Sequence, residues 1–138
     1  MPILNAGITF YGEPELSKMT IITCEPPYGK ERMYSALRFV LAALFEGHEI
    51  NIFLLEDSVF AAKKGQEPQE LPAGKDFRMP NCEVMLREAM KNGAKVMACG
   101  ACAMERGIKK EEVIEGITLA TILDLVEWVD GADKVVTF

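Results

Sequence analysis

The stretch Lys95 to Gly107 reads K-V-M-A-C-G-A-C-A-M-E-R-G, and it gives the clearest indication of the fold. A short apolar run ends at Cys99, and small, helix-favouring residues follow as far as Arg106. This pattern predicts a buried strand that delivers a cysteine to the start of a helix. Unpaired backbone N–H groups at a helix start favour a thiolate over a thiol. We therefore expect Cys99 to be a reactive cysteine that is accessible to other molecules.

The segments before this turn alternate between strand and helix. Residues 20–24 and 50–55 are compact β-branched or apolar runs, which predict strands. Between them, apolar residues recur at helical spacing from Met33 to Leu44, and Gly47 ends the pattern as a helix C-cap would. A continuous strand–helix–strand unit predicts a right-handed crossover and therefore a parallel sheet.

The rest of the chain repeats the alternation. Residues 56–64 predict a short helix, and a helix opens at Pro80 or Asn81 and closes at Gly93. Residues 65–79, without periodicity, predict a long loop. A last amphipathic helix, counted from Leu119 to residues 128–129, precedes a strand over 133–138. These elements predict an α/β protein, a three-layer α/β/α sandwich around a mainly parallel sheet of about five strands.

The domain organisation follows from where the regular pattern begins. We expect one α/β domain over residues 19–138, preceded by an N-terminal extension over residues 1–18. In the extension, Ile8, Phe10 and Tyr11 indicate a short extra strand, and residues 12–14 read as a turn.

Composition and charge narrow the functional classes. A formal net charge of −6 argues against a basic nucleic-acid-binding face and gives no reason to expect an anionic membrane surface as a partner. No apolar run is long enough to span a bilayer, and the first residues lack the basic and apolar regions of a secretory signal. We expect a cytoplasmic protein, in which the four cysteines stay reduced and are available for metal binding, redox work or catalysis.

Cys99 and Cys102 form a C-x-x-C motif with four interpretations. The cysteines could be buried and structural. A zinc site normally needs a second ligand pair at similar spacing, which this sequence lacks, so no metal is expected. A thioredoxin-type dithiol fits the strand–CGAC–helix form, but no proline follows Pro80 to pack beside the pair. The fourth interpretation is a nucleophilic cysteine that takes up sulfur as a persulfide.

Other candidate residues lie around the same predicted edge of the sheet. Cys24 and the loop over residues 25–30, with Tyr28 and Gly29, follow the first strand, at the carboxyl ends where ligands of open α/β sheets collect. Gly29 and the helix after it allow an anion cradle, although an ordinary turn fits equally well. Arg106 follows the cysteine turn and could stabilise a thiolate or an anionic sulfur donor.

Two remaining residues are assigned structural or capping roles. Cys82 opens the helix before the Cys99 strand and is interpreted as structural. His48, the one histidine, follows a helix end at the opposite side of the sheet from Cys99. This position favours a solvated or capping role for its side chain.

With these residues in view, the chain resembles the DsrE/TusD-like (DsrE/DsrF-like) family of sulfur-relay proteins from residue 19 to 138. The resemblance rests on four blocks: T-I-I-T-C-E-P-P-Y-G-K, E-G-H-E-I-N-I-F-L-L, V-M-A-C-G-A-C-A-M-E-R-G and A-D-K-V-V-T-F. The third is the most specific, because a cysteine followed by an Arg-Gly pair recurs in the family. Cys99 then matches the family's sulfur-accepting cysteine, Cys102 is an addition, and Tyr28 and Gly29 match a family loop.

The resemblance implies a flavodoxin-like subunit that assembles into homo-oligomers, trimers or hexamers. It also implies persulfide transfer between sulfur donor and acceptor proteins, without a metal or organic cofactor. On this hypothesis Cys99 attacks a sulfane sulfur and becomes Cys99–S–SH. Cys102 could then resolve the persulfide, which would release sulfide and leave a disulfide.

Three hypotheses for function therefore stand at this point. The first is a sulfur carrier or sulfurtransferase that uses Cys99. The second is a dithiol redox protein that uses Cys99 and Cys102. The third is a non-catalytic oligomeric ligand-binding module, in which the loop at Tyr28 is the cradle and the cysteines are incidental.

Overall fold

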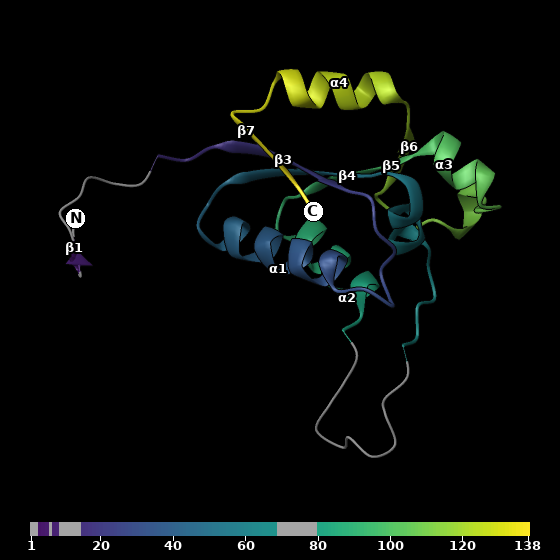
Figure 1. Cartoon of the computed structure of the whole chain (residues 1–138), viewed down its shortest axis with the longest axis horizontal. Coiled ribbons are helices and arrows are strands. Elements are labelled where there is room, and N and C mark those ends of the chain that lie inside the picture. The colour runs from purple at the N-terminus through teal and green to yellow at the C-terminus, as the bar shows by residue number, and fades with distance from the viewer. Residues whose placement is uncertain (1–2, 6, 9–14, 69–79) are drawn as a thin grey trace, which may run out of the picture.

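The computed structural model describes residues 3–5, 7–8, 15–68 and 80–138 (Figure 1). Five strands form one sheet in the order β6-β5-β4-β3-β7, and every neighbouring pair is parallel. The strands are β3 (Lys18–Thr23), β4 (Glu49–Leu54), β5 (Lys95–Cys99), β6 (Thr118–Ala120) and β7 (Lys134–Thr137). The predicted α/β class and the parallel five-stranded sheet are confirmed.

The helices form two layers, one on each face of this sheet. Helices α1 (Arg32–Phe45) and α2 (Cys82–Lys91) pack side by side on one face, and α4 (Ile122–Asp130) lies on the other (Figure 1). The short α3 (Gly100–Glu105) follows β5 directly, and the 3-10 helices η1 (Glu56–Ala62) and η2 (Lys110–Glu112) complete the connections. Helix α4 changes face because its connection from β6 to β7 runs back across the sheet.

Apolar strand residues fill the space between the layers. Ile21, Ile52, Phe53 and Leu54 are at most 1% exposed, as expected for parallel strands that helices cover on both faces. On the α4 side, the Phe53 ring meets Trp128 edge-to-face, with ring centroids 6.1 Å apart and an interplanar angle of 88°. Every helix in the described parts of the chain is too short or too polar to cross a membrane.

The last crossover differs from the prediction. Leu119, counted above as the first residue of the last helix, belongs to strand β6, and the helix begins only at Ile122. Thr121 caps it: the Asp124 backbone N–H bonds to the threonine hydroxyl, and the Asp124 carboxylate accepts the Thr121 N–H. This capping box is visible in the sequence as T-x-x-D, so the boundary could have been predicted.

The N-terminal segment contains a small separate sheet. Strand β1 (Ile3–Asn5) pairs antiparallel with β2 (Gly7–Ile8). Phe10, Tyr11 and the predicted turn at 12–14 lie outside the described residues, as do residues 69–79 of the predicted loop.

An ion-pair cluster joins the end of η1 to α2. Glu115 pairs with Lys64 at 3.2 Å and with Arg87 at 3.3 Å, and Arg87 also pairs with Glu83 at 2.8 Å. The pKa of Glu115 is lowered to about 2, first by its own backbone N–H and then by Lys64 and Arg87. A lowered carboxyl pKa stabilises the fold above the ordinary value of 4.5, and that contribution is lost as the pH falls toward about 2.

We therefore expect Glu115→Gln to lower the melting temperature slightly at neutral pH and to have no effect near pH 2. Thermal unfolding of both proteins across this pH range measures the difference. Glu111→Gln is the matched control, since Glu111 forms no ion pair within the described ranges. An equal effect of Glu115→Gln at both pH values would contradict the assignment.

Candidate functional site

The carboxyl edge of the sheet brings together the ends of β3, β4 and β5. The register aligns Thr23 with Leu54 and Leu54 with Ala98, so the residues that follow these strands emerge at one level. Cys24, Glu56 and the Cys99–Cys102 turn therefore occupy the same edge, with the β4 end between the other two. Because neighbouring strands are about 4.8 Å apart, the backbones at Cys24 and Cys99 are separated by roughly 10 Å.

Cys99 ends β5 and caps the first turn of α3. Its Sγ accepts the backbone N–H of Cys102 at 3.4 Å, as the strand-to-helix pattern predicts for a capping cysteine. Cys99 is only 7% exposed, however, whereas we expected an accessible sulfur. The reason is that Cys99 is still in register with Ala120 of β6, so it lies within the sheet rather than beyond it.

Cys102 is the more accessible thiol of the pair. It is partly buried and packs against the core cluster that contains Cys99. Burial and contact with the Cys99 thiol raise the pKa of Cys102, and the backbone N–H of Glu56 and the positive charge of Arg106 oppose this rise. The Cys99 sulfur bonds to the backbone N–H of Cys102, so the two thiols are neighbours at the first turn of α3, as an internal exchange of sulfur or of a disulfide would require.

The backbone N–H of Glu56 is a contact that sequence reasoning missed. It donates to Cys102 Sγ at 3.2 Å. Glu56 has a φ of +50°, a left-handed conformation that non-glycine residues seldom adopt. The turn is held on both sides: Leu55 N–H bonds to the Thr23 carbonyl, and the Ser58 hydroxyl donates to that carbonyl at 2.8 Å. The end of β3 therefore fixes the direction of the Glu56 N–H, which donates to the Cys102 sulfur at the start of α3.

Arg106 connects the cysteine turn to the same loop. Its Nε pairs with Asp57 at 2.8 Å, and another guanidinium nitrogen donates to the Cys102 carbonyl at 3.1 Å. The side chain thus holds α3 against η1 and supplies positive charge near Cys102. The guanidinium therefore lies beside Cys102, while Asp57 neutralises part of its charge.

Cys24 has different surroundings. Burial, followed by the negative charges of Glu56 and Glu25, raises the pKa of this partly buried thiol. Cys24 is therefore a weaker acid than an ordinary cysteine, and strand β4 separates it from the Cys99–Cys102 pair.

Tyr28 and Gly29 follow β3 and contribute to a separate cavity beside the start of α2. The Tyr28 hydroxyl donates to Gln66 Oε1 at 2.7 Å and accepts the backbone N–H of Cys82 at 3.0 Å. Gly29 adopts a φ of +90°, which lets the loop turn into α1. The predicted loop at the strand end is present, but it contacts the start of α2 rather than the cysteine pair.

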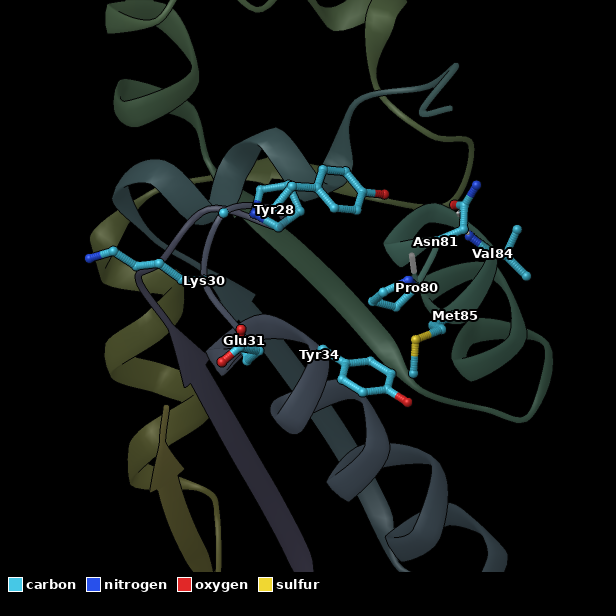
Figure 2. A pocket seen from close by; sticks show the side chains of 10 residues that line it. Tyr28, Lys30, Glu31, Tyr34, Pro80, Asn81, Val84 and Met85 are labelled. Atoms are coloured by element: carbon cyan, nitrogen blue, oxygen red, sulfur yellow. Dashed lines mark hydrogen bonds between the residues drawn. The ribbon is translucent and has the colours of Figure 1, made fainter. Parts of the chain in front are cut away.

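The cavity beside this loop has a volume of about 810 Å³ and is mainly apolar. Figure 2 shows Tyr34 and Met85 pointing toward one another across it, whereas Lys30 extends outward. Its size fits a drug-sized ligand, but none of the four cysteines lines it. The cavity thus lies at the carboxyl edge of the sheet but does not include the cysteine pair.

Cys82 and His48 have structural surroundings. Cys82 is fully buried, its Sγ lies 3.5 Å from the Pro27 carbonyl, and burial raises its pKa to about 11. At the opposite edge of the sheet, His48 Nδ1 accepts the Ser17 backbone N–H at 3.1 Å. Within the described ranges, no group of three or more His, Cys, Asp or Glu side chains is placed to hold a metal ion.

The protein is thus an all-parallel α/β domain with a cysteine pair at the carboxyl edge of its sheet. The chain matches the DsrE/DsrF-like family over residues 17–138 and belongs to that family, so the resemblance inferred from sequence is confirmed.

Several relatives cover most of the chain. An uncharacterized protein of Methanocaldococcus jannaschii is 52% identical over 121 residues, 88% of this chain and 99% of that protein. The protein YchN of Escherichia coli is 30% identical and covers 89% of this chain and 100% of its own, and its crystal structure superposes with a TM-score of 0.79. The sulfurtransferase TusD of Cronobacter sakazakii is 30% identical over 95 residues, 68% of this chain and 70% of that protein.

Proposed function

We propose that this protein is a cysteine-based sulfur carrier that accepts sulfane sulfur, holds it as a persulfide on Cys99 and passes it to an acceptor. The similarity to TusD sulfurtransferases supports sulfur relay at the family level. The observation that carries the proposal is the contact between Cys99 and Cys102 at the carboxyl edge of the sheet, with backbone N–H donors on both sulfurs.

The transfer chemistry needs only thiols. A thiolate of the pair attacks the outer sulfur of a donor persulfide; a new S–S bond forms, the donor S–S bond breaks, and its electron pair leaves with the donor thiolate. Delivery is the same exchange with an acceptor thiolate as the attacking group. N–H donors on the sulfurs stabilise the anions that form in each step. Neither step needs a metal or an organic cofactor, in line with the expectation from the family.

The partners we propose are sulfur donor and acceptor proteins and further copies of this chain. The outward face of α4 supports self-association, because Ile122, Leu123 and Val126 are 58–70% exposed and adjacent on the helix. A trimer or hexamer would bury this face. Because the carrier needs reduced thiols, we place the protein in the cytoplasm.

A dithiol redox function is the second candidate. The neighbouring positions of Cys99 and Cys102, within one helical turn, also favour a disulfide. The cavity at Tyr28 supports the third candidate, a ligand-binding module, independently of the thiols.

Cyanolysis tests the carrier function. Cyanide removes sulfane sulfur from a persulfide as thiocyanate, which is measured by colour. After treatment with inorganic polysulfide and removal of excess donor, we expect wild type to yield thiocyanate in near-stoichiometric amounts and the Cys99→Ser/Cys102→Ser double variant to yield a background level. Cys24→Ser is the matched thiol control and should behave as wild type. A double variant that still yields the wild-type amount would contradict the proposal.

A further inference from the structure

The two cysteines of the pair differ in how an external donor can reach them. Cys99 is 7% exposed and lies in register within the sheet, whereas Cys102 is partly exposed on the first turn of α3. A donor persulfide on another protein must bring its sulfur into line with the attacking thiolate. Cys102 offers that approach more readily than Cys99, because it is the more exposed of the two.

Cys102 also accepts a hydrogen bond from the loop that follows β4. The amide of Glu56 reaches it from a different strand end, and it does so from a left-handed conformation. Non-glycine residues persist in such a conformation only where the surroundings impose it, here through the bonds of Leu55 and Ser58 to the end of β3. Arg106, fixed by Asp57, adds positive charge on the same side.

We propose that Cys102 is the sulfur-entry residue: it takes the sulfane sulfur from the donor first and hands it inward to Cys99. This inference rests on the proposed carrier function. Glu56 acts as a positioning residue through its backbone N–H, which stabilises the Cys102 thiolate before attack and again when it leaves.

The two steps balance without an additional oxidant or reductant. The Cys102 thiolate attacks the outer sulfur of the donor, which forms Cys102–S–SH and releases the donor thiolate. The Cys99 thiolate then attacks that outer sulfur; the Cys102 S–S bond breaks, its electron pair returns to Cys102, and Cys99–S–SH results. The sulfur thereby moves from a partly exposed position to a buried one.

Rapid-quench peptide mapping tests the order. Wild type is mixed with limiting inorganic polysulfide, quenched at intervals with iodoacetamide and digested, and the modified cysteine is read by mass spectrometry. We expect the persulfide to appear on Cys102 first and on Cys99 later. Cys102→Ser and Cys102→Ala should both load Cys99 about tenfold more slowly or worse, because the buried thiol lacks a direct approach. In Cys99→Ser the persulfide should form on Cys102 and should not move further along the protein.

A second pair of variants isolates the Glu56 amide. Glu56→Gly keeps the N–H and favours the left-handed conformation, so entry at Cys102 should be retained. Glu56→Val opposes that conformation, so entry should slow several-fold while the melting behaviour of both variants is monitored as a check on folding. Equal entry rates for the two, with both folded, would remove Glu56 from the proposal.

The possible failures are distinguishable. If wild type acquires no persulfide on either cysteine, the carrier function itself is wrong. If Cys102→Ser loads Cys99 at the wild-type rate, or if Cys99 is modified first in wild type, the carrier stands and the entry role of Cys102 is overturned.

Discussion

Replacing Phe53 by alanine is expected to lower the free energy of unfolding by about 3–5 kcal/mol, the range for removing a fully buried aromatic side chain. Phe53 is 0% exposed on the central strand β4, which is hydrogen-bonded to strands on both sides. Its ring also contacts Trp128, so the substitution leaves a cavity between the sheet and α4. Because α4 covers its face of the sheet largely by itself, neighbouring helices cannot readily fill that cavity (Figure 1).

Chemical denaturation measures this effect, and Trp128, the sole tryptophan, reports on it through its fluorescence. Phe45→Ala is the matched control, because Phe45 is 89% exposed and its removal should change stability by no more than about 0.5 kcal/mol. A loss below about 1 kcal/mol in Phe53→Ala would mean that the contact with Trp128 is not part of the folded core.

The second large effect concerns retention of sulfur. Cys99→Ser is expected to lose the stably held sulfur almost completely, because the sulfur then stays on the partly exposed Cys102, where a thiol in solution can remove it. In wild type, the persulfide on the buried Cys99 should survive a thiol wash. The amount of sulfur that remains after the wash, measured as thiocyanate, distinguishes the two proteins. Cys24→Ser, which leaves the pair intact, should retain the wild-type amount.

Local pattern was sufficient to predict most of the elements of the fold. The runs at 20–24 and 50–55 became strands β3 and β4, and the crossover between them is parallel as expected. Strand β6 was missed because three residues carry too little periodicity to be separated from the helix that follows. The capping box at Thr121 is the signal that would have placed the boundary.

The candidate site was predicted only in part. Sequence spacing placed Cys99 and Cys102 at a strand-to-helix turn, since both lie within one local segment. The contribution of Glu56 and the pairing of Arg106 with Asp57 depend on β4 lying beside β5, which no local pattern specifies. For the same reason Cys24 was grouped with Cys99, although β4 separates their strands.

Burial of Cys99 was also beyond sequence reasoning. The apolar run before Cys99 predicts a buried strand, but it does not predict at which residue the strand leaves the sheet and becomes exposed. Pairing of β5 with β6 continues to Cys99 itself, opposite Ala120. The accessible thiol is therefore one helical turn further on, at Cys102, a residue that the resemblance to the family marked only as an addition with a possible resolving role.

The intact mass of the protein, recorded after treatment with inorganic polysulfide followed by a thiol wash, tests the central claim most directly. The account predicts that wild type gains the mass of one sulfur atom and that Cys99→Ser returns to its unmodified mass. Loss of two hydrogens in a wild-type sample taken before the thiol wash, which would reduce a disulfide, would contradict the carrier if changing either cysteine abolished it, and would favour the dithiol redox protein. A mass unchanged in both proteins before and after the wash would contradict any role for the thiols in sulfur transfer.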